Sequence, residues 1–153
     1  MRMLITRTIW LWGLLVLTAS SACAEDLLMV RSQLPFPEAM ATLQESIDAH
    51  GYKVARVQRV DIGLKGQGFK TDKYRVVFFG KPKEIDTLAK EYPKLIPYLP
   101  PKIAIFAENG QTILVTSNPA LFKRFYPDPK LAAHFDRWAR DFRAILDDVR
   151  KAQ

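Results

Sequence analysis

The chain has 153 residues, a formal net charge of +7 and a single cysteine. This length suits one domain with its own hydrophobic core, and one cysteine excludes an intramolecular disulfide. The positive charge favours anionic ligands or surfaces but is too small to indicate nucleic acid binding.

The N-terminal segment has the pattern of a secretory signal peptide. Residues 1–8 carry two arginines and no acid, Ile9–Leu17 is apolar, and Ala22-Cys23-Ala24 supplies the small residues of a cleavage site. The apolar run is shorter than the about 20 residues that a spanning helix needs. We therefore expect residues 1–24 to be removed, a chain that begins at Glu25, a periplasmic or secreted location and no stable membrane insertion.

Cys23 leaves a second outcome open, in which the protein is lipid-anchored through this residue. Bacterial lipidation sites usually carry an aliphatic residue three positions before the cysteine, where this chain has Ser20. Lipidation therefore ranks behind cleavage. Without Cys23 the domain, residues 25–153, has no thiol, so its stability has to come from core packing.

Residues 27–92 alternate between strand and helix patterns. The predicted elements are a strand at Leu27–Val30, a helix at Phe36–Ala49, a strand at Tyr52–Val60, a glycine-rich loop at Asp61–Gly68, a strand at Tyr74–Phe79 and a helix at Pro82–Tyr92. Both helices have one apolar side. The second strand alternates imperfectly, which indicates a bulge or an edge position, whereas the almost continuously apolar third strand is expected to be central.

Leu99–Ser117 has the strongest local signal in the chain, that of a β-hairpin. Asn109-Gly110 supplies the two residues that tolerate positive φ in a type I′ turn. The arms, Lys102–Ala107 and Gln111–Ser117, are rich in β-branched and aromatic residues. Because an isolated hairpin is only marginally stable in water, other elements have to cover its apolar face.

Two further helices are predicted at the C-terminus. Asn118-Pro119 and Asp128-Pro129 each combine an N-cap residue with a proline, and they open a short helix to Phe125 and a long one at about 130–150. The long helix carries an apolar stripe, spaced four and three apart: Leu131, Phe135, Trp138, Phe142, Ile145 and Val149. The stripe could pack within the chain, which we favour, or against the same helix of a second copy in a homodimer.

These elements predict a single domain with an α+β fold. Helices are expected on one face of an antiparallel or mixed sheet of about five strands, in a two-layer sandwich, with the long amphipathic helix at the C-terminus. The first six elements follow the order of a split β-α-β arrangement.

Several segments occur in an order that is typical of one family. They are Phe78–Lys83, Leu99-Pro100, the hairpin strands and Ser117–Leu121. Together they resemble the bacterial domain of unknown function family 302, over residues 30–125 and without the long C-terminal helix. The resemblance implies a two-layer α/β fold of two related β-α-β-β units and implies no activity. Some members have cysteines where this chain has Gly80 and Pro101, and Lys81 replaces the usual asparagine.

No catalytic or metal-binding cluster is recognisable from the sequence. His50 and His134 lack partners at ligand spacing, no Gly-x-Ser-x-Gly motif is present, and the glycine-rich loop matches no nucleotide-binding pattern. His134 is expected to be a partly exposed helical residue. The glycine-rich loop is expected to be a mobile connection whose glycines take positive φ. We expect no metal and no cofactor.

A group of basic residues surrounds the third strand. Lys65, Lys70 and Lys73 precede Tyr74, and Lys81 follows the strand. If the strand brought these ends together, the lysines, with Arg75 and Lys83, would form a basic rim with Phe69 and Tyr74 beside it. The five candidate site residues, which would bind an anionic small molecule or protein partner, are Lys65, Lys70, Lys73, Tyr74 and Lys81. A solvated face that keeps the protein soluble is the alternative and ranks first.

Two functions remain open at this point. The first is an exported, non-catalytic binding or interaction module of unknown ligand, for which nucleic acid is not an expected partner. The second is a small periplasmic enzyme that uses polar groups near Asp61, Tyr74 and Lys81. The lack of a recognisable catalytic cluster favours the first.

Overall fold

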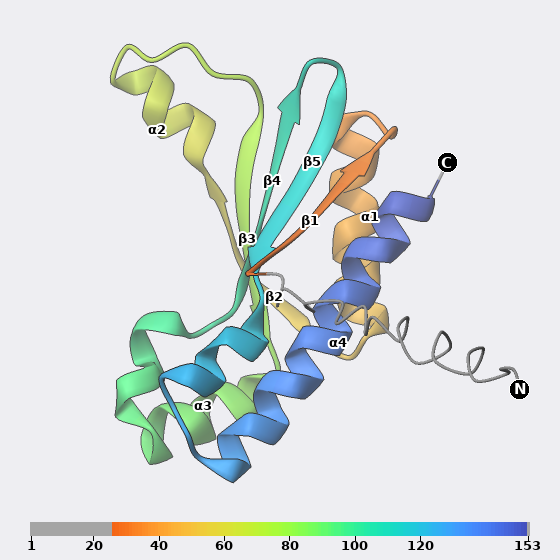
Figure 1. Cartoon of the computed structure of the whole chain (residues 1–153). Coiled ribbons are helices and arrows are strands. Elements are labelled where there is room, and N and C mark those ends of the chain that lie inside the picture. Colours follow the sequence, from red (N-terminus) through yellow and green to blue (C-terminus); the bar gives the residue numbers. More distant parts are fainter. Residues whose placement is uncertain (1–25, 153) are drawn as a thin grey trace, which may run out of the picture.

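The computed structural model describes residues 26–152, so the predicted signal peptide and its cleavage site lie outside the described residues. Strands, α-helices and two 3-10 helices alternate along this part of the chain (Figure 1). In order, the elements are β1 (Leu27–Ser32), α1 (Phe36–Ala49), β2 (Lys53–Arg59), α2 (Val60–Gly66), β3 (Tyr74–Gly80), α3 (Pro82–Glu91), η1 (Pro93–Tyr98), β4 (Lys102–Glu108), β5 (Gln111–Ser117), η2 (Pro119–Arg124) and α4 (Pro129–Lys151).

The strands form one antiparallel sheet with the order β1-β5-β4-β3-β2. The predicted hairpin is confirmed as β4 and β5, and its turn residues Asn109 and Gly110 have φ of 50° and 78°. β3 has a neighbour on both sides, as expected. β2 is an edge strand and also has a register shift between Val54 and Arg56, so both alternatives for this strand hold.

The strand order differs from that of a split β-α-β arrangement. In such a unit one strand separates the two strands that the first helix joins. Here β5, β4 and β3 all lie between β1 and β2, because the hairpin is inserted between β1 and β3. The chain order of the elements did not reveal this, since β1 and its partner β5 are widely separated in the sequence, with Leu27 paired to Ser117.

The prediction of a loop at residues 61–68 is wrong in its first part, which forms the helix α2. Asp61 lies in the first turn, where a negative charge favours a helix, and its buried carboxylate accepts a hydrogen bond from Arg75 of β3. This ion pair holds the start of α2 against β3. The tertiary contact outweighs the low helix propensity of Gly63 and Gly66. Among them only Gly68 has a positive φ, 87°.

Two helices, α1 and α4, cover one face of the sheet, while α2 lies at one end and α3, η1 and η2 at the other (Figure 1). All six residues of the predicted stripe on α4 are buried, and they join a core with Leu43, Ile47, Phe79 and Ile105. The long helix therefore packs within the chain, as favoured above. The stripe is thus buried in the single chain and is not exposed on its surface.

Polar contacts also join α1 to α4. Ser46 Oγ donates a hydrogen bond of 2.6 Å to Asp148 Oδ2, and His50 Nε2 lies 3.1 Å from the same oxygen. The Ser46 hydroxyl, and then His50, hold the pKa of Asp148 below its ordinary value of 3.8. The ionised form of Asp148 is therefore bound more favourably in the folded state than the protonated form.

Replacing Ser46 by alanine is expected to lower the free energy of unfolding by up to about 1 kcal/mol at neutral pH, since Asp148 is half exposed. Because the folded-state pKa of Asp148 lies below the unfolded one, this stabilisation is present above the unfolded pKa and is lost as the pH falls through the folded pKa. The difference from wild type, measured by urea denaturation, should therefore shrink below about pH 4. A difference independent of pH, or an equal effect of Thr42→Ala on the same helix, would contradict this.

Candidate functional site

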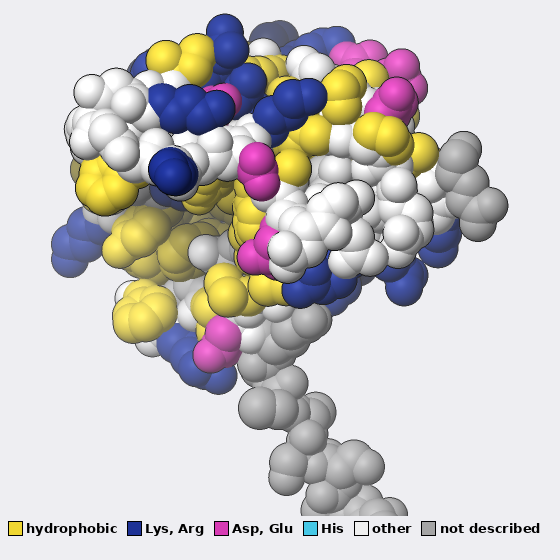
Figure 2. All heavy atoms as spheres, turned by 90° about the horizontal axis from the view of Figure 1, so that it is seen from above, with side chains coloured by type: hydrophobic (Ala, Val, Ile, Leu, Met, Phe, Trp, Pro, Cys, Tyr) yellow, Lys and Arg dark blue, Asp and Glu magenta, His cyan; other side chains and the backbone are white. Residues whose placement is uncertain are grey.

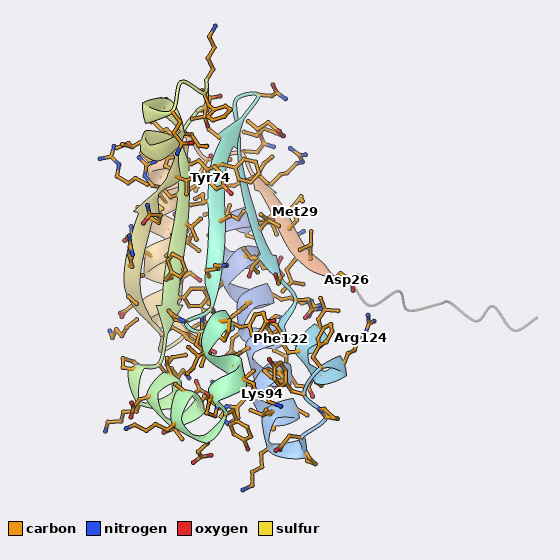
Figure 3. All side chains as sticks on the ribbon, turned by 90° about the vertical axis from the view of Figure 1, so that its left-hand side faces the viewer. Asp26, Met29, Tyr74, Lys94, Phe122 and Arg124 are labelled. Atoms are coloured by element: carbon orange, nitrogen blue, oxygen red, sulfur yellow. The ribbon has the colours of Figure 1, made fainter. Side chains whose placement is uncertain are left out.

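Within residues 26–152 no helix packs on the second face of the sheet, and Figure 3 looks onto this face, with Met29 and Tyr74 on the near side. The side chains that point to this face are mainly apolar. Val76, Ala104, Val115 and Met29 lie next to one another in register across β3, β4, β5 and β1. Leu27 and Met29 of the edge strand are 52% and 50% exposed. A strip of apolar residues thus crosses four strands without a covering element in the described part of the chain.

This face is concave. A sheet groove of about 390 Å³ is lined by Leu27, Gln58, Tyr74, Val76, Phe78, Lys102, Ala104, Val115, Thr116 and Ser117. It adjoins an end pocket of about 310 Å³, with which it shares Phe78, Lys102, Thr116 and Ser117. Hydrophobic side chains also line a hollow in the view from above, with lysine and arginine side chains around its margin (Figure 2).

The end pocket lies where β4 and β5 meet η1, η2 and α4. Its walls are rich in proline and aromatic residues: Pro97 and Tyr98 from η1, the Leu99-Pro100-Pro101 segment, Pro119 and Phe122 from η2, and Trp138 and Phe142 from α4. The rings of Tyr98 and Phe122 pack with centroids 5.0 Å apart. Rigid rings and prolines give this pocket a preformed shape, which is typical of sites for small molecules.

Lys102 is the one charged residue among those that line the sheet groove and the end pocket, and no aspartate or glutamate lines either. Its amine lies 5.9 Å from the centre of the Phe78 ring, and its backbone carbonyl accepts a hydrogen bond from Thr116 Oγ1. The site therefore combines apolar walls with a single cation at the junction of its two parts.

Only one of the five predicted site residues, Tyr74, lines the groove. Lys65 lies on α2 and Lys70 in the segment that follows, and both are exposed. Lys73 contacts the helical layer instead, with its amine 5.8 Å from the ring of Phe36. Lys81 follows the far end of β3, with its amine 4.8 Å from the ring of Tyr52.

The predicted basic rim is therefore not a single site. A strand of seven residues is about 23 Å long, so β3 separates Lys81 from the lysines before it rather than bringing them together. Neighbouring residues of a strand also point to opposite faces, which separates Lys73 from Tyr74. The polar groups of the enzyme alternative are also separated. Asp61 of α2 forms an ion pair with Arg75, and Lys81 follows the other end of β3.

Apart from Tyr74, the groove residues are not among those predicted from the sequence, although the sequence contains one signal for them. The run Tyr74–Phe79 is apolar on both of its faces, and a strand that is half exposed should alternate instead. One apolar face, that of Val77 and Phe79, is buried in the core, while Val76 and Phe78 line the groove. Apolar residues on both faces of a strand can mark either two covering layers or one layer and a binding surface.

A polar cluster lies outside the groove, between α3, α4 and the start of β2. Tyr52 donates a hydrogen bond of 2.5 Å to Asp141, and Glu84 accepts from Arg137 and lies 2.6 Å from His134 Nδ1. Burial, and then the bond to Asp141, raise the pKa of the Tyr52 hydroxyl. His134 is a partly exposed helical residue, as expected, and also belongs to this network. The network joins α3 to α4 through partly buried contacts.

Within residues 26–152 no group of three or more His, Cys, Asp or Glu side chains is arranged to hold a metal ion. In the same range no helix combines the length and the apolar character needed to cross a bilayer.

Fold and groove together define a small α+β domain whose sheet is covered on one face and open on the other. The family model described as "Domain of unknown function DUF302" matches residues 28–149, so the chain belongs to the DUF302 family. The predicted resemblance is confirmed, but its limits were too narrow, because the match includes almost all of α4. Packing of α4 onto the sheet makes it part of the domain's core.

Solved structures are also similar to this chain, and one of them covers most of it. It is the crystal structure of an uncharacterised conserved DUF302 protein from Bacillus stearothermophilus, with a TM-score of 0.75 and 23% identity, covering 83% of this chain and 100% of that chain. At this identity the similarity shows the fold alone. No curated protein matches the chain.

Proposed function

We propose that this protein is an exported, non-catalytic binding module that holds an apolar ligand in the sheet groove and the end pocket. The observation that carries the proposal is the uncovered apolar strip of Met29, Val76, Ala104 and Val115, which opens into a preformed pocket. Covering apolar surface stabilises a complex by about 25 cal/mol per Å². Exposed contiguous apolar patches in soluble proteins commonly mark sites of interaction.

The shape of the face favours a small ligand over a flat partner surface. Helix α2 and the two 3-10 helices stand at opposite ends of the sheet, and the space between them is hollow (Figures 1 and 2). The two parts of the site, about 310 and 390 Å³, fall within the range of about 300–1,000 Å³ that is typical of small-molecule sites. Export rests on the signal pattern of residues 1–24.

Filling the groove with a larger side chain should weaken the binding of an apolar ligand. Wild type is expected to bind the uncharged apolar dye Nile red with a rise in its fluorescence, and Ala104→Phe should weaken this binding by about tenfold or more, because the new ring occupies the middle of the groove. The phenylalanine is added on the open face, so the core should be unaffected. Ala133→Phe, on the exposed side of α4, is the matched control and should bind as wild type does.

Two results would overturn the proposal. One is a wild type that does not bind the dye, or binds it no better than Ala104→Phe does. The other is a wild type that light scattering shows to be a dimer and that Ala104→Phe converts into a folded monomer, because the open face would then serve self-association.

A further inference from the structure

We infer that the ligand is a single-chain anionic amphipath, with its acidic group beside Lys102 and its apolar chain along the strands of the sheet groove. This inference rests on the proposed function and adds the chemical class of the ligand. It follows from the distribution of charge in the site and from the direction in which the site extends.

The charge of the site selects an anionic group. Lys102 is the one cation among the lining residues, and no acidic side chain lines either part to neutralise it. In the described part of the chain its amine makes no ion pair within 4.0 Å, and its contact is with the face of the Phe78 ring. A carboxylate, sulfate or phosphate monoester beside Lys102 would form a charge-assisted hydrogen bond, whereas a second cation would be repelled.

Charges around the site favour the same sign. Lys94 of η1 and Arg124 of η2 lie on the same side of the molecule as Phe122, at the end of the sheet where the end pocket opens (Figure 3). Asp26 is also on this side, but it lies at the β1 edge and lines neither part of the site. Residues 25–153, the chain without the predicted signal peptide, carry 21 Lys and Arg against 16 Asp and Glu, a net charge of +5, so the field around the site attracts anions.

The shape of the site selects an extended apolar chain. From Lys102 the sheet groove runs along β3 and β4, past Phe78, Val76 and Ala104 to Tyr74. Four residue steps along a strand cover about 13 Å, and the lining also extends across the sheet from Leu27 of β1 to Gln58 of β2, so the groove is longer than one ring. The ligand's acidic group would thus lie at the junction with the end pocket, and its chain would extend along β3 and β4 over Phe78, Val76 and Ala104.

The test compares three probes at concentrations below micelle formation: dodecanoate, dodecyltrimethylammonium and Nile red. Wild type is expected to bind dodecanoate about tenfold or more tightly than the cation, by calorimetry at low salt. Lys102→Met should abolish this preference and leave Nile red binding unchanged, since methionine keeps the apolar stem. Lys70→Met, an exposed lysine outside both parts of the site, should retain the preference.

Each contrary outcome has a distinct meaning. If Nile red binds but Lys102→Met still prefers dodecanoate, the inference is wrong and the proposed function stands. If neither Nile red nor dodecanoate binds, both are wrong. If the protein sediments with vesicles of anionic phospholipid but does not bind monomeric dodecanoate, the site recognises a membrane surface, and the inference is again wrong.

Discussion

Deletion of residues 129–153, which removes α4, is expected to leave a chain that does not fold as a stable monomer. Eight residues of this helix are buried: Leu131, Phe135, Trp138, Ala139, Phe142, Ile145, Leu146 and Val149. Fully burying one large apolar side chain contributes about 1.5–3 kcal/mol, so losing seven of them costs about 10–21 kcal/mol, which equals or exceeds the about 5–15 kcal/mol by which whole domains are stable. Deletion also exposes the apolar side chains of α1 and β1 against which α4 packs.

The polar contacts of α4 add to this effect. Ser32 Oγ of β1 donates a buried hydrogen bond of 3.1 Å to the backbone carbonyl of Val149, and deletion would leave the hydroxyl without this acceptor. Circular dichroism, urea denaturation and light scattering should show an unfolded or aggregated chain. Deletion of residues 152–153 alone is the control and should have no measurable effect. A truncated chain that is monomeric and as stable as wild type would refute the role of α4 as part of the core.

Replacing Trp138 by alanine is expected to lower the free energy of unfolding by about 3–5 kcal/mol. The side chain is 3% exposed and stacks on Phe142, with ring centroids 6.5 Å apart and planes at 7°, and it also contacts Phe135 edge-on. Alanine would leave a cavity that joins the end pocket, because Trp138 forms part of its wall. The surrounding rings and prolines limit how far the structure can relax into this space.

Urea denaturation of Trp138→Ala and of Arg140→Ala separates packing from helix propensity. Arg140 lies on the exposed side of the same helix, so its replacement should change the free energy of unfolding by no more than about 0.5 kcal/mol. A loss below about 1 kcal/mol for Trp138→Ala would mean that the ring contributes little to the core. Equal losses for the two variants would contradict its assignment to the core.

The candidate site could be predicted from the sequence only in part. Tyr74 was identified, but for its place beside the lysines rather than for the open face on which it lies. Lys102 was recognised as the first residue of a hairpin arm and not as the one charge in an apolar site. Periodicity shows that a strand has two faces, but it does not show which face a helix covers.

Short-range sequence patterns were sufficient to predict several helices, helix caps and the hairpin turn. The helix predicted at Phe36–Ala49 has the same limits in the structure, and the side chains of Asn118 and Asp128 cap η2 and α4 as their position before proline predicts. The Asn109-Gly110 turn and the stripe of α4 are confirmed for the same reason. Capping, turn conformation and helical periodicity depend on residues only a few positions apart, so they can be predicted from the sequence without knowledge of the tertiary structure.

Tertiary structure alone decided the strand order, the helix at Val60–Gly66 and the groove. β1 pairs with β5, which is distant in the sequence, α2 is held by the ion pair of Asp61 with Arg75, and the groove is formed by side chains of β1, β2, β3, β4 and β5. Each of these depends on contacts between distant segments, whose free energy is gained only when the whole sheet has formed. The covered face and the open face both consist of apolar side chains, so only the packing of α1 and α4 distinguishes core from binding surface.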